Sequence, residues 1–171
     1  MTSPGATSNH RSDVAPETRL RPGLLVLFST LSLATLAAGG LLTSLGIGPW
    51  YRNLRIPWFQ PPAWAFPPAW TIIFILLAFA TWRVARHGMT AKAAIGAYAC
   101  QLVSNVLWSL FFFPMQRPDL ALVDIIILDV IVVAMIPLYG RIDRTCGWLL
   151  VPYAAWLALA TAINVWIVMY N

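Results

Sequence analysis

The chain has 171 residues, of which 60% are apolar and only 10% are charged. Soluble domains usually contain about 45–50% apolar and about 25% charged residues, so this composition argues against a water-soluble globule. The mean hydropathy of +0.73 and the nine tryptophans indicate a domain whose solvent is lipid, and the length suits one such domain.

The net charge of +5 comes from eleven basic and six acidic residues. The basic residues flank apolar runs and form no aromatic-interleaved stripe, so we expect topology signals rather than nucleic-acid binding. Two cysteines cannot form a disulfide framework, and we expect free thiols, Cys100 within an apolar run and Cys146 in a loop. The two histidines, His10 and His87, lack the paired spacing of a zinc or haem site, so no metal is expected.

Residues 1–22 mix Ser, Thr, Pro, Gly and Arg without apolar periodicity, which predicts a disordered N-terminal tail. The uncharged run over residues 24–45 then matches the ~20 residues that a helix needs to cross a bilayer. A signal peptide is the alternative, but its apolar region would be only about 7–15 residues long, so a retained helix is favoured. Four further runs of spanning length follow, at residues 67–86, 92–113, 120–139 and 148–169.

These runs predict an all-α membrane protein in which residues 23–171 form an antiparallel bundle of five transmembrane helices with short connections. Basic residues are unevenly divided between its two ends. The side of the N-terminus holds Arg11, Arg19, Arg21, Arg83, Arg86, Lys92, Arg141 and Arg144, and the other side holds Arg52, Arg55 and Arg117. By the positive-inside rule this predicts a bacterial inner-membrane protein with a cytoplasmic N-terminus and with the first loop and the C-terminus outside.

The long connection over residues 46–66 contains Trp50, Trp58 and Trp64 among several prolines. Prolines at 49, 57, 61 and 62 remove backbone donors and fix φ, which predicts neither a helix nor a central strand. Tryptophan and tyrosine also gather at membrane interfaces as simple anchors. Because the aromatic residues are too many for a flexible linker, we expect an ordered cap on one end of the bundle.

Helical spacing predicts two aromatic stripes, on the second and the fifth span: Trp70, Phe74 and Leu77, and Tyr153, Trp156, Ala160 and Asn164. A polar stripe on the third span would be costly against lipid and should face inward: Gln101, Asn105 and Ser109. Together the stripes predict an apolar, aromatic pocket suited to a flat conjugated ligand, with ordinary helix packing as the alternative.

Two carboxylates, Asp124 and Asp129, fall inside the fourth span, where each should face inward, pair or be protonated. They are about 140° apart on a helical wheel, so one face cannot hold both. A structural hydrogen bond to a neighbouring helix is favoured over a proton or ion pathway. Small residues at spacing four on the first span permit close approach, within the bundle or between protomers: Thr35, Gly39 and Thr43.

Three segments carry a longer joint pattern. The first contains Trp50, Tyr51, Leu54, Pro57, Trp58, Pro61, Pro62, Phe66, Pro68, Trp70 and Thr71. The second contains Asn105, Trp108, Ser109, Phe111 and Phe112, and the third contains Pro152, Tyr153, Trp156, Ala160 and Asn164. Over about residues 24–170 the chain thereby resembles the tryptophan-rich sensory protein / translocator protein family, also called the peripheral benzodiazepine receptor family.

The resemblance implies a five-helix fold with a cavity beneath the first loop that binds protoporphyrin and related tetrapyrroles and, in some members, sterols and synthetic aromatic ligands. It implies an integral membrane protein that senses or regulates porphyrin intermediates or stress, often as a homodimer. Protoporphyrin IX or a haem-like porphyrin is expected as a ligand, with no covalent cofactor. The expected ligand contacts are Trp50, Tyr51, Trp70, Phe74, Asn105, Trp108, Ser109, Tyr153, Trp156 and Ala160.

Two alternatives to a binding protein remain open. Some bacterial relatives are reported to degrade protoporphyrin in light with tryptophans that match Trp70 and Trp156, which would make an enzyme without a conventional catalytic site. The second alternative is transport of porphyrin or sterol. In that case the stiff first loop would open about a hinge near Gly46 and Gly48. A sterol ligand is disfavoured, because Val165 stands where the animal sterol motif has tyrosine and no basic residue follows it.

Overall fold

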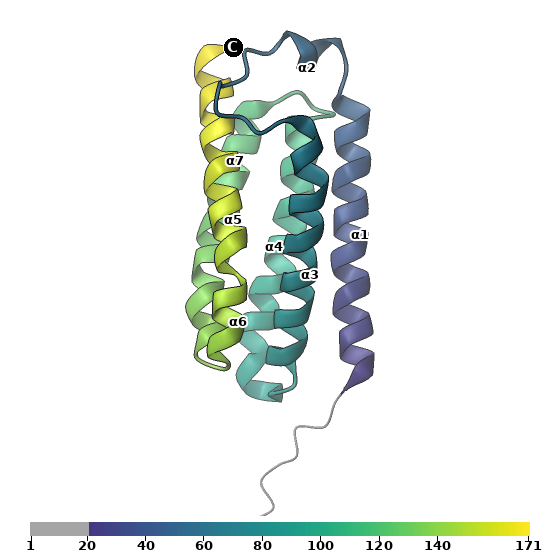
Figure 1. Ribbon diagram of the computed structural model, residues 1–171, viewed down its shortest axis with the longest axis vertical. Coiled ribbons are helices and arrows are strands. Elements are labelled where there is room, and N and C mark those ends of the chain that lie inside the picture. Colours follow the sequence, from purple (N-terminus) through teal and green to yellow (C-terminus); the bar gives the residue numbers. More distant parts are fainter. Residues whose placement is uncertain (1–20) are drawn as a thin grey trace, which may run out of the picture.

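The computed structural model describes residues 21–171, and five helical segments in them are long and apolar enough to cross a membrane (Figure 1). They are α1 (Pro22–Gly46), η1 (Ala63–Ala65) with α3 (Phe66–Ala85), η2 (Gly88–Ala91) with α4 (Lys92–Phe112), α5 (Pro118–Gly140), and α6 (Arg144–Leu149) with α7 (Val151–Tyr170). The all-α class and the five spans are therefore as the sequence predicts. Most of the expected tail, with His10, Arg11 and Arg19, lies outside the described residues.

Proline begins most of these helices, since five of them have it in the first or second position: α1, α2 (Pro49–Asn53), α3, α5 and α7. The N–H groups in the first turn of a helix have no acceptor within that helix, so proline loses no hydrogen bond there, and the proline ring fixes φ near the helical value. The expectation of a helix-free first loop is therefore wrong, because Pro49 starts a helix rather than preventing one. For the same reason α1 already begins at Pro22, within the range predicted as tail.

The last span is also divided, into α6 and α7. Asp143 caps α6 by accepting a hydrogen bond of 2.9 Å from the Thr145 backbone N–H. Cys146 is consequently buried in a helix, not placed in a loop as the sequence suggested, and both cysteines are free thiols as expected. Pro152 lies in the first turn of α7 and has no N–H to continue the α6 ladder.

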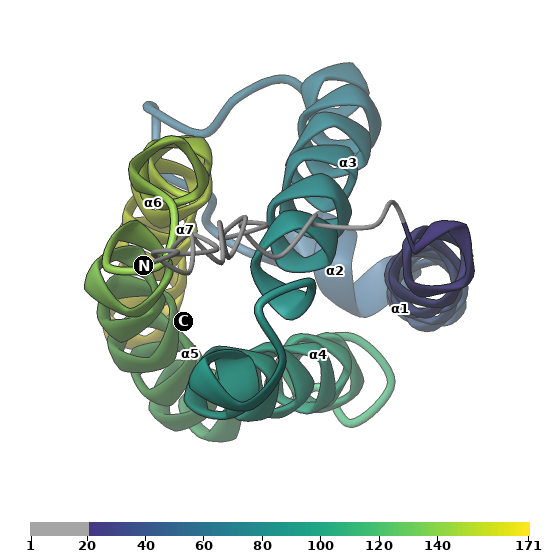
Figure 2. The same cartoon turned by 90° about the horizontal axis from the view of Figure 1, so that it is seen from below.

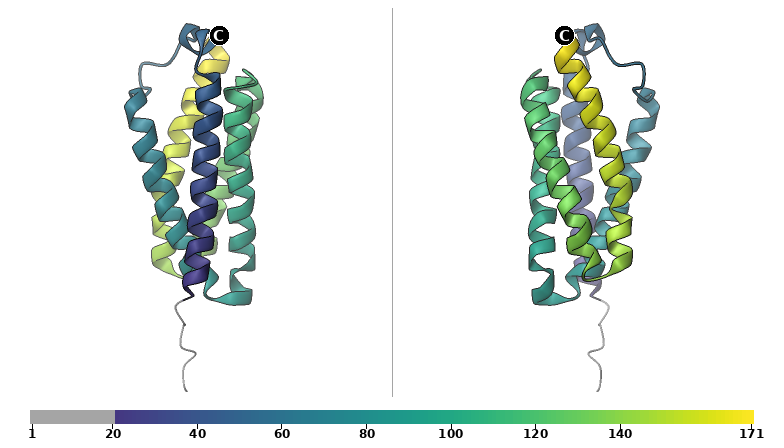
Figure 3. Two further views of the ribbon diagram at one scale, coloured as in Figure 1. Left: turned by 90° about the vertical axis from the view of Figure 1, so that its right-hand side faces the viewer. Right: turned by 90° about the vertical axis from the view of Figure 1, so that its left-hand side faces the viewer.

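The helices form a ring in the order α1, α4, α5, α7 and α3 when the bundle is viewed along its length (Figure 2). α1 packs on α3 and α4, α4 on α5, and α5 on α6 and α7. α3 meets α6 near one end of the bundle, but the backbones of α3 and α7 scarcely approach one another. The two helices diverge from α6 towards the end that carries α2 (Figure 3).

Close approaches and buried hydrogen bonds fix the packing between neighbouring helices. Tyr98 of α4 shares a 2.9 Å hydrogen bond with Ser32 of α1, and Tyr139 of α5 shares one of the same length with Thr81 of α3. These bonds give buried hydroxyl groups partners that lipid cannot supply. Near the α6 end, an ion pair joins Arg83 of α3 to the capping residue Asp143.

Candidate functional site

Five aromatic residues of α3 and α7 form what we call the aromatic cradle: Phe66, Trp70, Phe74, Tyr153 and Trp156. The Trp70 ring lies 6.0 Å from Phe74, 6.1 Å from Tyr153 and 6.4 Å from Trp156, measured between centroids. Phe66 meets Trp156 edge to face at 5.5 Å. Phe74 and Tyr153 are buried and the other three are half-buried, so the cradle is the main link between the upper parts of α3 and α7.

Two consecutive hydrogen bonds connect α4 to the Tyr153 side of the cradle. The Asn105 amide donates to the Tyr153 hydroxyl at 3.2 Å, and that hydroxyl donates to Gln101 Oε1 at 3.0 Å. Gln101, Asn105 and Ser109 are all buried, as predicted for a polar stripe that avoids lipid. These two hydrogen bonds therefore fix the Tyr153 ring beside Trp70.

Two hydrogen-bond donors next to these hydrogen bonds have no partner among the residues that the structure describes. Gln101 is fully buried and its Oε1 accepts from Tyr153, but its Nε2 donates to nothing, and the buried Trp156 Nε1 is likewise unpaired. Leaving a buried donor unsatisfied costs about 1–3 kcal/mol, so such groups call for an explanation. Both residues flank the Trp70–Tyr153 contact, and a ligand with acceptor atoms there would satisfy them.

The first loop covers the end of the bundle above the cradle, and we call residues 47–65 the lid. On one side of the lid Trp50 lies 6.0 Å from Phe112, and Tyr51 lies 5.7 Å from Phe113. On the other side Phe59 lies 6.1 Å from Trp166 of α7. The backbone of Arg55 is tied to the Asn171 side chain by hydrogen bonds of 2.7 and 3.5 Å.

The expected site residues separate into groups. Trp70, Phe74, Tyr153 and Trp156 come together in the cradle, and Asn105 joins them through Tyr153. Trp50 and Tyr51 belong to the lid instead.

Three further expected residues lie outside the cradle contacts. Trp108 stacks on Phe112 at 5.3 Å and donates to Asn164 Oδ1 at 3.0 Å. Ser109 donates to the Asn105 carbonyl of its own helix and faces Gly39 of α1. Ala160 is half-buried one turn above Trp156.

One cradle residue and one residue hydrogen-bonded to the cradle were not among the expected ligand contacts. Phe66 is one of the matched positions in the first segment, and that match was the signal that could have identified it. Gln101 was recognised in the polar stripe, but no sequence pattern reveals which of its amide atoms lacks a partner.

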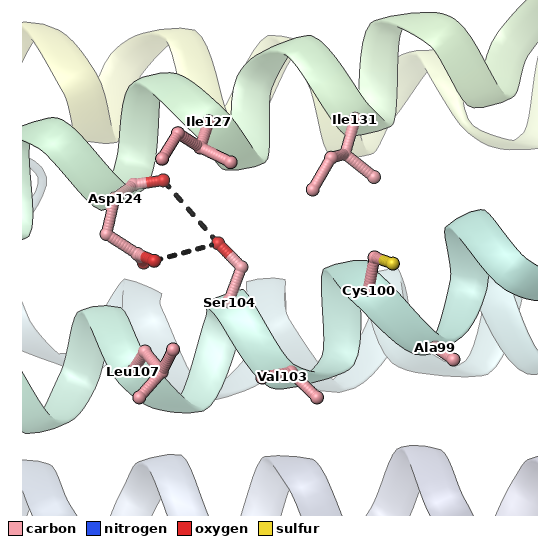
Figure 4. Close-up of a pocket in the computed structure, with 8 residues that line it drawn as sticks. All are labelled: Ala99, Cys100, Val103, Ser104, Leu107, Asp124, Ile127 and Ile131. Carbon is pink, nitrogen blue, oxygen red and sulfur yellow. Dashed lines mark hydrogen bonds between the residues drawn. The ribbon is translucent and has the colours of Figure 1, made fainter.

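The carboxylates of α5 make interhelical hydrogen bonds, as the structural interpretation predicted. Asp124 Oδ1 accepts from Ser104 of α4 at 3.2 Å, and Asp129 accepts from Thr161 of α7 at 2.7 Å. Asp124 borders a groove of about 390 Å³ between α4 and α5, shown with its eight lining residues in Figure 4. None of the expected ligand contacts lines this groove, and in the described part of the chain no three His, Cys, Asp or Glu side chains gather as metal ligands.

Comparison with known proteins agrees with this architecture. The sequence profile of the TspO/MBR family matches residues 27–170. The chain is 38% identical to the tryptophan-rich sensory protein of Cereibacter sphaeroides over 138 residues, which cover 78% of this chain and 87% of that protein.

Two further relatives come from distant organisms. The chain is 35% identical to the tryptophan-rich protein TspO of Chlorobaculum tepidum over 150 residues, 86% of this chain and 95% of that protein. It is 32% identical to the translocator protein of Homo sapiens over 119 residues, 67% of this chain and 70% of that protein. A profile match over nearly all of the helical region, together with relatives this similar, establishes that the chain is a membrane protein of the TspO/MBR family.

Proposed function

We propose that this protein binds a tetrapyrrole in the aromatic cradle and acts as a sensor or regulator of porphyrin intermediates. The observation that carries the proposal is a set of indole and phenol rings from two helices beside two buried donors that lack acceptors. Relatives named as sensory proteins support the regulatory part of the proposal.

The chemistry of the cradle suits a flat, conjugated ligand. Indole faces give large, rigid stacking area, and the donors on Gln101 and Trp156 would pair with ring nitrogens or carboxylates of the ligand. Trp70 and Trp156 now touch edge to face, so a planar macrocycle would have to separate them and replace their contact with stacking. The Asn105–Tyr153–Gln101 chain would keep the rest of the wall in place.

Titration with protoporphyrin IX, followed by quenching of tryptophan emission, tests the proposal. Saturable quenching is expected, and Trp70→Phe or Trp156→Phe should weaken binding by about 2- to 10-fold, because one aromatic contact contributes about 0.5–1.5 kcal/mol. Trp148→Phe is the matched control, since Trp148 is exposed on α6 away from the cradle. Equal affinity in all three variants would contradict a site in the cradle.

Light- and oxygen-dependent breakdown of the porphyrin is a second candidate, favoured by the direct contact of Trp70 with Trp156. An indole beside a light-excited porphyrin can give it one electron, which the porphyrin radical anion passes to dioxygen, and the neighbouring ring offers a second site for the indole radical cation. The macrocycle then returns an electron to the indole, and the porphyrin radical cation combines with superoxide, so that the net reaction adds dioxygen to the porphyrin and restores the indole. Illuminated turnover should then disappear in the Trp70→Phe/Trp156→Phe double variant. Equal product formation by that variant or by lipid vesicles alone would exclude catalysis.

We further propose that the lid faces outward from a bacterial inner membrane. Arg52, Arg55 and Arg117 lie at the lid end, whereas most of the other described basic residues lie at the opposite end. A single cysteine replacing Trp58, with Cys100 and Cys146 changed to alanine, should react with a membrane-impermeant maleimide in intact cells. Labelling only after the cells are opened would reverse the orientation.

A further inference from the structure

The contact of α3 with the last span, α6 at one end and α7 at the other, which we call the seam, is built differently at its two ends. Near α6 it is closed by helix packing and by the ion pair of Arg83 with Asp143. Towards the lid the two helices diverge (Figure 3). Aromatic rings join them there: Trp70 with Tyr153 and Trp156, and Phe66 with Trp156. The upper seam is thus closed by side chains, whereas the lower seam is closed by packed backbones and an ion pair.

The first part of the lid, residues 47–54, is firmly attached to α4. A Cβ atom on Gly46, just before it, would lie 2.4–2.6 Å from Phe113, so the end of α1 is in close contact with the end of α4. Trp50 and Tyr51 then pack on Phe112 and Phe113. A hinge at Gly46, as expected for a lid that opens upwards, would have to break this contact.

The second part of the lid, residues 56–65, is held much less firmly. Its backbone hydrogen bonds are local, such as Gln60 N–H to the Pro57 carbonyl and Ala65 N–H to the Pro62 carbonyl. In the described part of the chain no hydrogen bond joins residues 56–65 to α1, α4, α5 or α7, although Arg55 just before them is bonded to Asn171 at the end of α7. Trp58 and Trp64 are 88% and 75% exposed. The ring contact of Phe59 with Trp166 ties this part to α7.

We infer that the upper seam is a lateral portal through which the tetrapyrrole enters the cradle from the bilayer, an inference that rests on the proposed function. Residues 56–65 and the first turns of α3 move away from α7, while α2 and the Arg83–Asp143 end stay in place. The ring faces that part are then exposed to the acyl chains of the lipid rather than to water, so that opening the seam exposes no apolar surface to water. Lifting the whole lid would instead expose the apolar interior to water and remove Trp50 and Tyr51 from α4.

Reversible cross-linking tests the portal. In a background with Cys100→Ala and Cys146→Ala, the double variant Phe59→Cys/Trp166→Cys is bridged with a short bis-methanethiosulfonate reagent, which ties residues 56–65 to α7. Arg83→Cys/Asp143→Cys is the matched control, because its bridge ties α3 to the start of α6 at the lower end of the seam, where no movement is required. Association of protoporphyrin IX with vesicle-embedded protein is followed by stopped-flow quenching before and after reduction of the bridge.

The bridge between positions 59 and 166 should slow association at least 10-fold, with full recovery on reduction, and the bridge between positions 83 and 143 should change it less than 2-fold. The single variant Phe59→Ala should speed association and dissociation alike. Unchanged rates with the first bridge, or equal slowing by both, overturn the portal while leaving the proposed function intact. Absence of saturable binding in the unmodified protein overturns both.

Discussion

Glycine at position 147 allows α6 to touch α5. A Cβ atom there would lie 2.9 Å from the Ile136 carbonyl oxygen and 3.0 Å from the Gly140 Cα atom, both of them backbone atoms that cannot turn aside. Gly96 of α4 has no atom within 4 Å of the equivalent position. Alanine substitutions at these two positions therefore distinguish the need for close packing at Gly147 from the general preference of helices for alanine.

Gly147→Ala should lower stability by about 1–3 kcal/mol, the usual range for overpacking. Gly96→Ala should raise it by about 0.5–1 kcal/mol, because alanine is the better helix former. Thermal unfolding of the two variants in the same detergent measures both effects. A Gly147→Ala midpoint at or above that of the unchanged protein would show that α5 and α6 can separate at no cost.

Gln116, in the turn between α4 and α5, is the only described non-glycine residue with positive φ, at 54°. This left-handed conformation costs an L-residue roughly 1–2 kcal/mol, and glycine avoids that cost. Part of the gain is offset, because glycine has more conformational freedom to lose when the chain folds. Gln116→Gly should therefore raise the unfolding midpoint, whereas Gln116→Ala should not. A lower midpoint for the glycine variant would indicate that the Gln116 side chain itself stabilises the turn.

The sequence predicted that individual polar side chains of the spans face the bundle interior, but it could not predict their hydrogen-bond partners. Gln101, Asn105 and Ser109 had to avoid lipid, and they do. That Tyr153 accepts from one of them and donates to another depends on the register between α4 and α7, which spacing along a single helix does not contain.

At the scale of helices, hydropathy predicted each span to within a few residues but missed the short helices α2 and α6. Both are too short to produce an apolar period, and proline was taken as a helix breaker although it stands in the first turn of α2. The N-cap Asp143 was a readable signal for α6, since aspartate is among the preferred capping residues.

The pairing of Arg83 with Asp143 links α3 to the start of α6. Burial raises the pKa of Asp143, but hydrogen bonds from the Arg83 guanidinium and the Thr145 N–H lower it by more, so this pKa lies below its ordinary value. Because the folded-state pKa is the lower one, the stabilisation is complete above the unfolded value of about 3.9 and is lost as the pH falls through the folded one.

Asp143→Asn should therefore lower the unfolding midpoint at pH 7, by an amount that corresponds to up to about 1 kcal/mol for a partly exposed pair. Asparagine retains the oxygen that caps α6, so the variant removes the charge and not the cap. Measured at pH 3, the variant and the unchanged protein should approach one another. A difference that persists unchanged in acid would assign the effect to α6 rather than to the ion pair.

For the whole molecule, the number of membrane spans follows from the apolar runs along the sequence, but the order of the helices around the ring does not. Consecutive spans are neighbours in the ring except for α3 and α4, between which α1 lies (Figure 2). The ring is completed by contacts between spans that are not consecutive, α1 with α4 and α3 with α7. The sequence predicted that the aromatic stripes on these two spans line one pocket, but their direct contact depends on the order of the helices around the ring.

A ligand held in the cradle would tie the diverging ends of α3 and α7 together and so stabilise the whole bundle. At a protoporphyrin IX concentration of 100 times Kd, linkage predicts about 2.7 kcal/mol of added stability, which should raise the unfolding midpoint by several degrees. The shift should be greatly reduced in the Trp70→Phe/Trp156→Phe double variant and retained in Trp148→Phe, because only the first pair lies in the cradle. An equal shift in both variants would mean that the macrocycle stabilises the protein from another surface, and the aromatic contact between α3 and α7 would then serve packing alone.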